Sequence, residues 1–243
     1  MRDAVYNTHR LVKNPKMSAR YLADYMAASD SVRRSIIVKC KYPAIARIVQ
    51  HKEANVAIAR FLTQGKGDTS ALKERAQALR ERMADDEFDR DVLDHNADFI
   101  DRFVSVHHLL DFPKANLEAV GNAPPIDLSG VHLTVSLAFR LRRVTRTNEV
   151  RIGVGSLRYA KGSNLPPETG SWQAAILLGY LTLANAEAKA VPEGKLCVIV
   201  DARSGRVYPA PSDSIRRFKH TEAACTTIAE QWQNIPPPKG AVL

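Results

Sequence analysis

The residue pattern of this chain changes at Asn122-Ala123-Pro124-Pro125. Before this point apolar residues recur at helical spacing and glycine is scarce. After it they alternate or form short continuous runs, as in β-strands. A chain with both patterns is expected to be an α+β protein. We therefore expect an all-helical region over residues 1–122, a sheet domain over residues 123–235, and a mobile Pro-rich tail at residues 236–243.

The last helix of the first region is expected over about residues 88–110. Val92, Phe99 and Phe103 fall on one side of it, which gives the helix an apolar face that can pack on the sheet. Upstream, Gly65-Lys66-Gly67-Asp68 interrupts the helical pattern and separates two earlier helices.

The residue pattern of the second region predicts the element order strand–strand–helix–strand–strand–helix. Elements in this order are expected to form a mixed sheet with flanking helices. Its expected elements are a strand at 132–144, a hairpin partner at 149–161, a helix at 171–188, strands at 196–200 and 207–208, and a helix from about 212 to 232. The run at 196–200 is apolar throughout, which is typical of a strand buried on both faces.

Composition and charge narrow the class of protein. With 45% hydrophobic and 25% charged residues, the chain is not collagen-like, disulfide-stapled or wholly disordered. Its 35 Lys and Arg outnumber its 26 Asp and Glu, which gives a formal net charge of +9. Such an excess favours a polyanionic partner such as nucleic acid.

The expected location is cytoplasmic and bacterial in type. The first residues lack the continuous apolar run of a secretory signal. The most apolar window, 174–184, is shorter than the about 20 residues that cross a bilayer, so no membrane partner is expected. Cys40, Cys197 and Cys225 are far apart in apolar or helical surroundings, which predicts reduced, buried thiols. The sequence does not indicate an oligomeric state.

Three segments of the second region carry a family resemblance. They are Leu157-Arg158-Tyr159-Ala160-Lys161 at the end of the hairpin, Trp172-Gln173-Ala174-Ala175 continuing to Tyr180 on the next helix, and Val200-Asp201 at the end of a strand. With the order of elements, they make residues 90–211 similar to the PD-(D/E)XK nuclease-like superfamily, in its RecB-like lineage. The resemblance implies a restriction-endonuclease-like sheet, with Lys161, Gln173 and Tyr180 as matches to the family motif.

Active members of that superfamily hold a divalent metal with carboxylates from a helix, from the hairpin and from a (D/E)-X-K strand. Mg²⁺ prefers such oxygen ligands, and the lysine positions or activates the attacking water. Here the hairpin segments 135–140 and 153–158 contain no carboxylate. We therefore expect a catalytically silent domain with no catalytic residue, metal or other cofactor. The alternative is a Mg²⁺-dependent DNA nuclease whose ligands have migrated to Asp94, Asp98 or Glu168.

Four aspartates form a stripe on the helix expected at 88–110. Asp91, Asp94, Asp98 and Asp101 are three, four and three residues apart, so they share one face. Carboxylates at this spacing can bind a divalent cation. The simpler interpretation is a solvated face opposite the apolar stripe, because one helix rarely surrounds an ion.

Basic residues gather on the predicted hairpin and form the candidate nucleic-acid-binding set. They are Arg140, Arg142, Arg143, Arg146 and Arg151, with Arg158 and Lys161 farther along the second strand. Guanidinium groups match phosphate oxygens in geometry, and strand alternation places Arg140 and Arg142 opposite Phe139 and Leu141. The competing interpretation is charge that protects a sheet edge from aggregation.

Residues 18–25 followed by Arg33 and Arg34 give the N-terminal region a helix–turn–helix pattern, which would direct these arginines at DNA. A helical accessory region that binds a protein partner is the competing interpretation. The leading hypothesis for the whole chain is a nucleic-acid-binding member of a bacterial DNA-processing, repair or defence assembly. The alternatives are the nuclease and a non-catalytic protein–protein interaction module. Neither DNA nor RNA is favoured.

Overall fold

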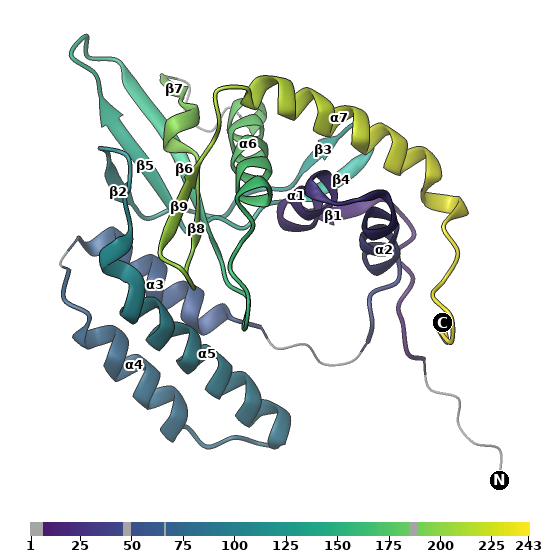
Figure 1. Ribbon diagram of the computed structural model, residues 1–243, viewed down its shortest axis with the longest axis horizontal. Helices are drawn as coiled ribbons and strands as arrows, with labels where there is room; N and C mark the ends of the chain where they lie inside the picture. The colour runs from purple at the N-terminus through teal and green to yellow at the C-terminus, as the bar shows by residue number, and fades with distance from the viewer. Residues whose placement is uncertain (1–6, 46–49, 66, 185–188) are drawn as a thin grey trace.

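The computed structural model describes residues 7–45, 50–65, 67–184 and 189–243, and it confirms the α+β class (Figure 1). The described α-helices are α1 (Ala19–Ala27), α2 (Asp30–Lys41), α3 (Lys52–Gln64), α4 (Ser70–Glu81), α5 (Glu87–Val106), α6 (Pro167–Ala184) and α7 (Ser214–Gln231). Short 3-10 turns follow α5 and α7 at His107–Leu109 and Trp232–Asn234, and another lies at Gly194–Leu196.

The strands form two sheets. Their bounds are β1 (Lys16–Ser18), β2 (Asn116–Glu118), β3 (Ile126–Leu128), β4 (Val131–Thr134), β5 (Phe139–Val144), β6 (Val150–Arg158), β7 (Ala190–Pro192), β8 (Val198–Asp201) and β9 (Arg206–Pro209). The large sheet has the order β2-β5-β6-β8-β9, with β7 also paired to β6. The small sheet has the order β1-β4-β3. Because β6 and β8 are parallel, α6 is the crossover that joins them.

Capping side chains explain where α1 and α5 begin. The Ser18 hydroxyl accepts a hydrogen bond from the Tyr21 amide at 3.2 Å and starts α1. The Asp86 carboxylate accepts one from the Asp89 amide at 2.8 Å and starts α5. Each side chain satisfies an amide that has no partner within its own helix.

The predicted strand at 132–144 is two strands that belong to different sheets. β4 ends at Thr134 in the small sheet, and β5 begins at Phe139 in the large one. Apolar residues alternate in both strands, so the sequence pattern continues across the break and hides it. The hairpin itself is confirmed, since β5 pairs antiparallel with β6 from Phe139↔Gly155 to Val144↔Val150.

One correction concerns the region predicted as all-helical, and a further observation concerns the tail. The region predicted as all-helical also supplies β1 and β2, which at three residues are too short to leave an alternating pattern. The tail at 236–243, predicted to be mobile, is tied to the N-terminal segment. The Val242 carbonyl accepts bonds from the amides of Thr8 (2.9 Å) and His9 (3.1 Å), and its own amide donates to the Thr8 hydroxyl.

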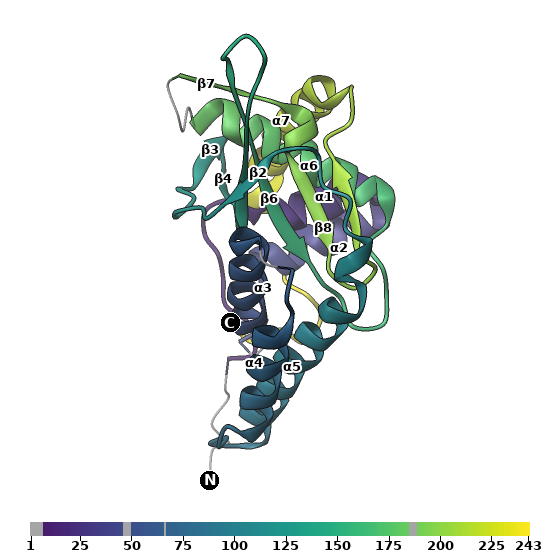
Figure 2. The same ribbon diagram turned by 90° about the vertical axis from the view of Figure 1, so that its left-hand side faces the viewer.

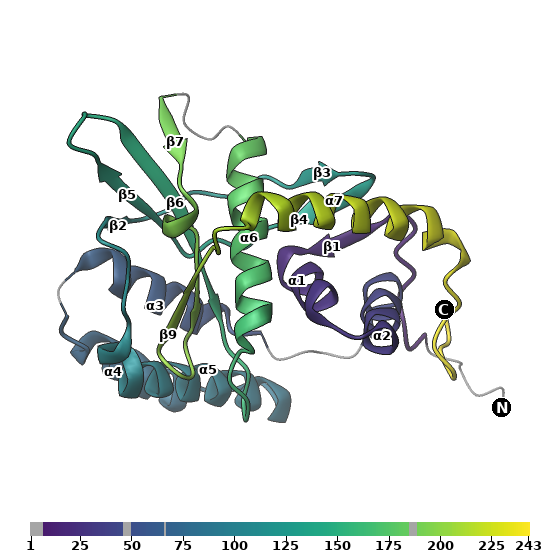
Figure 3. The same ribbon diagram turned by 45° about the horizontal axis from the view of Figure 1, so that its top comes forward.

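The first five helices pack in two groups on either side of α6 (Figure 3). Helices α1 and α2 share a core with α7 and the small sheet, in which Leu22, Leu133 and Trp232 are fully buried. Helices α3, α4 and α5 share another core, which reaches Tyr159 at the end of β6. Figure 2 shows this second group extending away from the large sheet.

The large sheet is covered on both faces. On one face, Ala174 and Leu177 of α6 pack against Ile152 and Ile199. On the other, Phe139 packs with Val200 and with half-buried side chains that include Leu62 of α3. The strand at 198–201 is thus buried on both faces, as its apolar run predicts. No helix in the described parts of the chain is long and apolar enough to cross a membrane.

The cysteines are free thiols, and we expect Cys197 and Cys225 to resist alkylation in the native protein. Burial raises the pKa of each thiol to about 12, so the reactive thiolate is scarce at neutral pH. Iodoacetamide labelling followed by peptide mass spectrometry should modify both in denaturant and neither in buffer. Rapid labelling of Cys197 in buffer would contradict the buried position of β8.

Candidate nucleic-acid interface

The arginines of the β5–β6 hairpin alternate with buried residues as expected. Phe139 and Leu141 are fully buried, while Arg140 and Arg142 lie half-exposed on the other face. Beyond them, Arg143 and the turn residue Arg146 are exposed. The backbone geometry of the hairpin therefore matches the prediction.

Three of these arginines are bound by carboxylates of the same protein. Arg140 binds Glu118 on β2 at 2.6 Å, and Arg151 binds Glu149 at 2.6 Å. Arg143 makes two bonds to Glu193, at 2.9 and 2.7 Å. Each ion pair neutralises an arginine that was expected, from the sequence, to bind phosphate. The hairpin is therefore much less basic than its sequence indicates.

Arg158 is not a surface residue. Its side chain is 9% exposed and binds the Asp24 carboxylate of α1 at 2.5 Å, with the Arg20 carbonyl at 3.5 Å. Burial lowers the pKa of the guanidinium, and Asp24 acts in the opposite direction. Strand alternation turns this position inward, toward α1. Arg158 is therefore buried at its contact with α1, whereas the sequence pattern placed it in the basic set of the hairpin.

The matches to the family motif occupy three different environments. Lys161 is exposed beyond the end of β6, with its ammonium 3.8 Å from the Asp98 carboxylate of α5. Gln173 is buried on α6, and its side-chain oxygen has no hydrogen-bond partner among the described residues. The Tyr180 hydroxyl donates to the Pro124 carbonyl at 3.0 Å and so ties α6 to the segment before β3.

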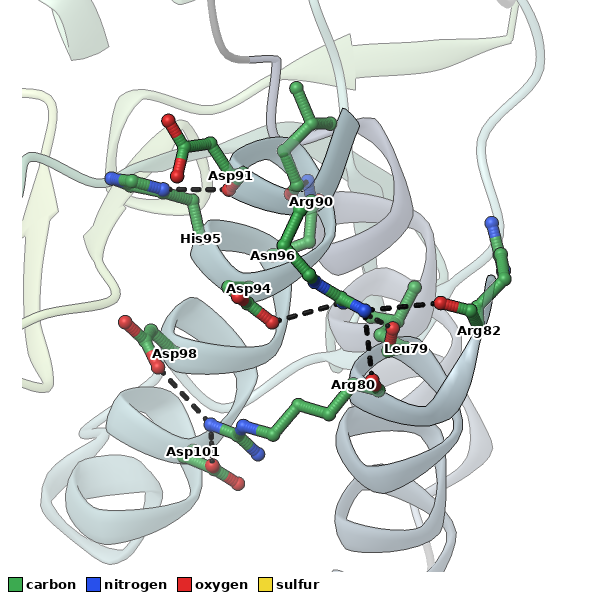
Figure 4. Close-up of polar contacts among 11 residues, drawn as sticks. Leu79, Arg80, Arg82, Arg90, Asp91, Asp94, His95, Asn96, Asp98 and Asp101 are labelled. Carbon is green, nitrogen blue, oxygen red and sulfur yellow. Dashed lines mark hydrogen bonds and ion pairs between the residues drawn. The ribbon is translucent and has the colours of Figure 1, made fainter. Parts of the chain in front are cut away.

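The aspartate stripe of α5 faces arginines (Figure 4). Arg80 of α4 binds Asp98 at 3.1 Å and Asp101 at 2.7 Å, and Arg90 binds Asp94 at 3.0 Å. Arg80 thus joins α4 to Asp98 and Asp101 of α5, whereas the Arg90–Asp94 pair lies within α5.

The remaining carboxylate of the nuclease alternative is also paired. Glu168, at the start of α6, binds Arg217 of α7 at 2.6 Å. Within the described ranges of the chain, no group of three or more His, Cys, Asp or Glu side chains is arranged to hold a metal ion.

A basic groove lies between α3 and the large sheet, and we call it the α3 groove. It encloses about 560 Å³ between α3, the segment Ser136–Ala138 that leads into β5, and residues 119 and 120 after β2. Two cations, Lys52 and Arg60, line it together with the polar side chains of Asn55 and Thr63. Among the described residues that line it, none carries a carboxylate.

The two cations of the α3 groove have no acidic partner among the described residues. Lys52 and Arg60 are exposed, and neither makes an ion pair with any residue that the structure describes. Glu53, the nearest acid along the chain, faces α4 and binds Arg75 and Arg82. The positive charge of the groove is therefore available to a ligand.

His51 comes directly before Lys52, the first residue of α3, and its side chain is partly buried. Its ring packs edge-on against Phe99 and Tyr159, with centroids 5.5 and 5.4 Å away. Burial lowers the pKa of His51, and the charges of His95 and Arg20 lower it further.

Comparison of the sequence with protein-family models and with curated proteins gives no match. The evidence for the candidate interface is therefore the set of side chains that line the α3 groove. Sequence reasoning missed Lys52 and Arg60, although a signal was present. Residues 52, 55, 56, 59, 60 and 63 recur at helical spacing on one face of α3, and four of these six are polar or basic.

Proposed function

We propose that this protein binds nucleic acid through the α3 groove and that its large sheet is a catalytically silent nuclease-like fold. The observation that carries the proposal is a groove that presents Lys52 and Arg60, neither paired with a described acid, and no carboxylate among its described lining. In a protein of net charge +9, such a groove attracts a polyanion.

The side chains of the groove suit phosphate contacts. The planar guanidinium of Arg60 can donate two parallel bonds to one phosphate, and the ammonium of Lys52 acts as a point charge. Asn55 and Thr63 add uncharged donors on the same helix face. These groups contact a backbone without reading its sequence, so the proposal is binding with little sequence preference.

One observation supports binding without cleavage. The carboxylates that could supply a migrated metal site, Asp94, Asp98 and Glu168, are each bound to an arginine. An assembly that processes DNA or RNA can use such a domain to hold its substrate.

The test is a charge reversal of the α3 groove, Lys52→Glu together with Arg60→Glu. We expect at least a tenfold loss of affinity for short DNA or RNA, and a drop of about 2 in the slope of log affinity against log salt, because two phosphate contacts are lost. Fluorescence anisotropy with labelled oligonucleotides measures both. Lys52 is the first residue of α3, where a glutamate also favours the helix dipole, so the fold should tolerate the change.

The matched control is Lys195→Glu with Lys219→Glu, which changes the net charge by the same amount at exposed positions outside the groove. An equal loss of affinity in the control would show that net charge alone drives binding and would overturn the groove proposal. Unchanged affinity in the groove variant would do the same. Plasmid nicking by the purified protein with Mg²⁺ or Mn²⁺ would overturn the catalytically silent part.

A further inference from the structure

A second groove, whose described lining contains no carboxylate, lies on the outer face of α2, and we call it the α2 groove. It encloses about 620 Å³ between α2, the Tyr21 ring of α1 and the segment that contains Pro43. Arg34 and Lys39 of α2 line it, together with Val38. It belongs to the packing group on the other side of α6 from the α3 groove (Figures 1 and 3).

The charges of the α2 groove are also available. Arg34 and Lys39 are exposed and make no ion pair with a described residue. The acid that begins the helix, Asp30, is bound by Arg33 at 3.3 Å. Arg33 also donates to the carbonyls of Tyr25 at 3.0 Å and Met26 at 3.3 Å, so it joins α1 to α2 and does not reach outward.

The apolar part of the groove includes an exposed aromatic ring. Tyr21 is 44% exposed, and Val38, Pro43 and Pro238 add apolar surface beside it. An aromatic ring next to two cations fits a nucleotide, whose base stacks on the ring while its phosphates meet the charges. In a duplex the faces of the bases are covered by their neighbours. An unpaired strand, by contrast, presents the face of a base and its phosphates together.

The walls of the α2 groove are already formed. The Arg10 amide bonds to the Pro43 carbonyl at 3.0 Å, and the Ile45 amide bonds to the Thr8 carbonyl at 2.9 Å. The Lys41 ammonium, at the end of α2, is held by the carbonyls of Trp232 (2.6 Å) and Ile235 (3.0 Å). A preformed surface lowers the ordering cost of binding.

We infer that the α2 groove binds single-stranded nucleic acid by stacking a base on Tyr21 and pairing phosphates with Arg34 and Lys39. The inference rests on the proposed function for the class of ligand, but not on the α3 groove. It adds the form of the substrate: an unpaired strand, or the unpaired end of a duplex.

The test compares Tyr21→Ala with Tyr21→Phe on a single strand of about 12 nucleotides and on a duplex of the same length. Stacking needs the ring and not the hydroxyl, so Tyr21→Phe should keep wild-type affinity. Tyr21→Ala should lose about tenfold on the single strand and little on the duplex. Arg34→Glu with Lys39→Glu should show the same preference with a larger loss.

The outcomes separate this inference from the proposed function. If Tyr21→Ala and the Arg34, Lys39 variant bind the single strand like the wild type, the inference fails even where the α3 groove variant has lost binding. If the wild type binds neither probe, both fail. If the α2 groove variants instead lose an acidic peptide or a co-purifying protein and keep the single strand, the groove is a protein-docking site and the inference is wrong.

Discussion

Replacing Asp24 with asparagine is expected to lower the free energy of unfolding by about 3 kcal/mol. Arg158 is 9% exposed, and Asp24 is the carboxylate bound to it, at 2.5 Å. The asparagine keeps the shape of the side chain but leaves the buried guanidinium without the carboxylate that binds it. The value lies at the low end of the range for a broken buried pair, because Asp24 itself is 29% exposed and Asp201 also acts favourably on Arg158.

The mechanism is tested by the double variant Asp24→Asn with Arg158→Met, measured by urea unfolding. Removing both charges should recover part of the loss, since a well-packed apolar side chain replaces a buried ion pair at little cost. A double variant that is as unstable as the sum of the two single variants would contradict this account.

An exposed ion pair supplies the control. Asp30 binds Arg33 at 3.3 Å, but its side chain is 98% exposed. Asp30→Asn should change the free energy of unfolding by less than about 1 kcal/mol, because solvent screens the pair. If Asp24→Asn is no more costly than Asp30→Asn, Arg158 is not buried in solution as it is in the structure.

The sequence predicted the elements whose pattern is long. The helix expected at 88–110 is α5 with its 3-10 extension. The helix expected at 171–188 is α6, which begins at Pro167; the last four residues of that prediction lie outside the described residues. The hairpin follows from apolar alternation, and the buried strand at 198–201 follows from the continuous apolar run predicted at 196–200. β1 and β2 could not be found this way, because three residues are too few to establish a period.

The ion pairs of the predicted site could not be found from the sequence, because the acid that binds a basic residue can be distant in sequence. Arg143 is bound by Glu193, 50 residues away, and Arg158 by Asp24, 134 residues away. A count of arginines on a hairpin cannot show these pairs. The helical spacing of Lys52 and Arg60 is visible in the sequence, but only the fold shows that no described acid pairs with them.

The second prediction with a large effect concerns Gly153 in the middle of β6. We expect Gly153→Ala to lower the free energy of unfolding by about 3 kcal/mol. A Cβ at this position would overlap the carbonyl group of Leu196, which is backbone in the 3-10 turn that leads into β8. Because backbone cannot rotate away as a side chain can, either β6 or this turn must shift.

Gly155, two residues along the same strand, separates this backbone obstacle from a side-chain one. A Cβ there would overlap the ring of Phe139, so the damage from Gly155→Ala should be partly relieved by Phe139→Leu. The damage from Gly153→Ala should not be relieved by Leu196→Ala, since the carbonyl remains.

Gly121→Ala, whose Cβ would meet nothing within 4 Å, is the matched control and should cost less than about 0.5 kcal/mol. Urea unfolding that shows Gly153→Ala as mild as Gly121→Ala would mean that the turn at 194–196 does not lie against β6. The parallel pairing of β6 with β8 that the turn leads into would then be wrong as well.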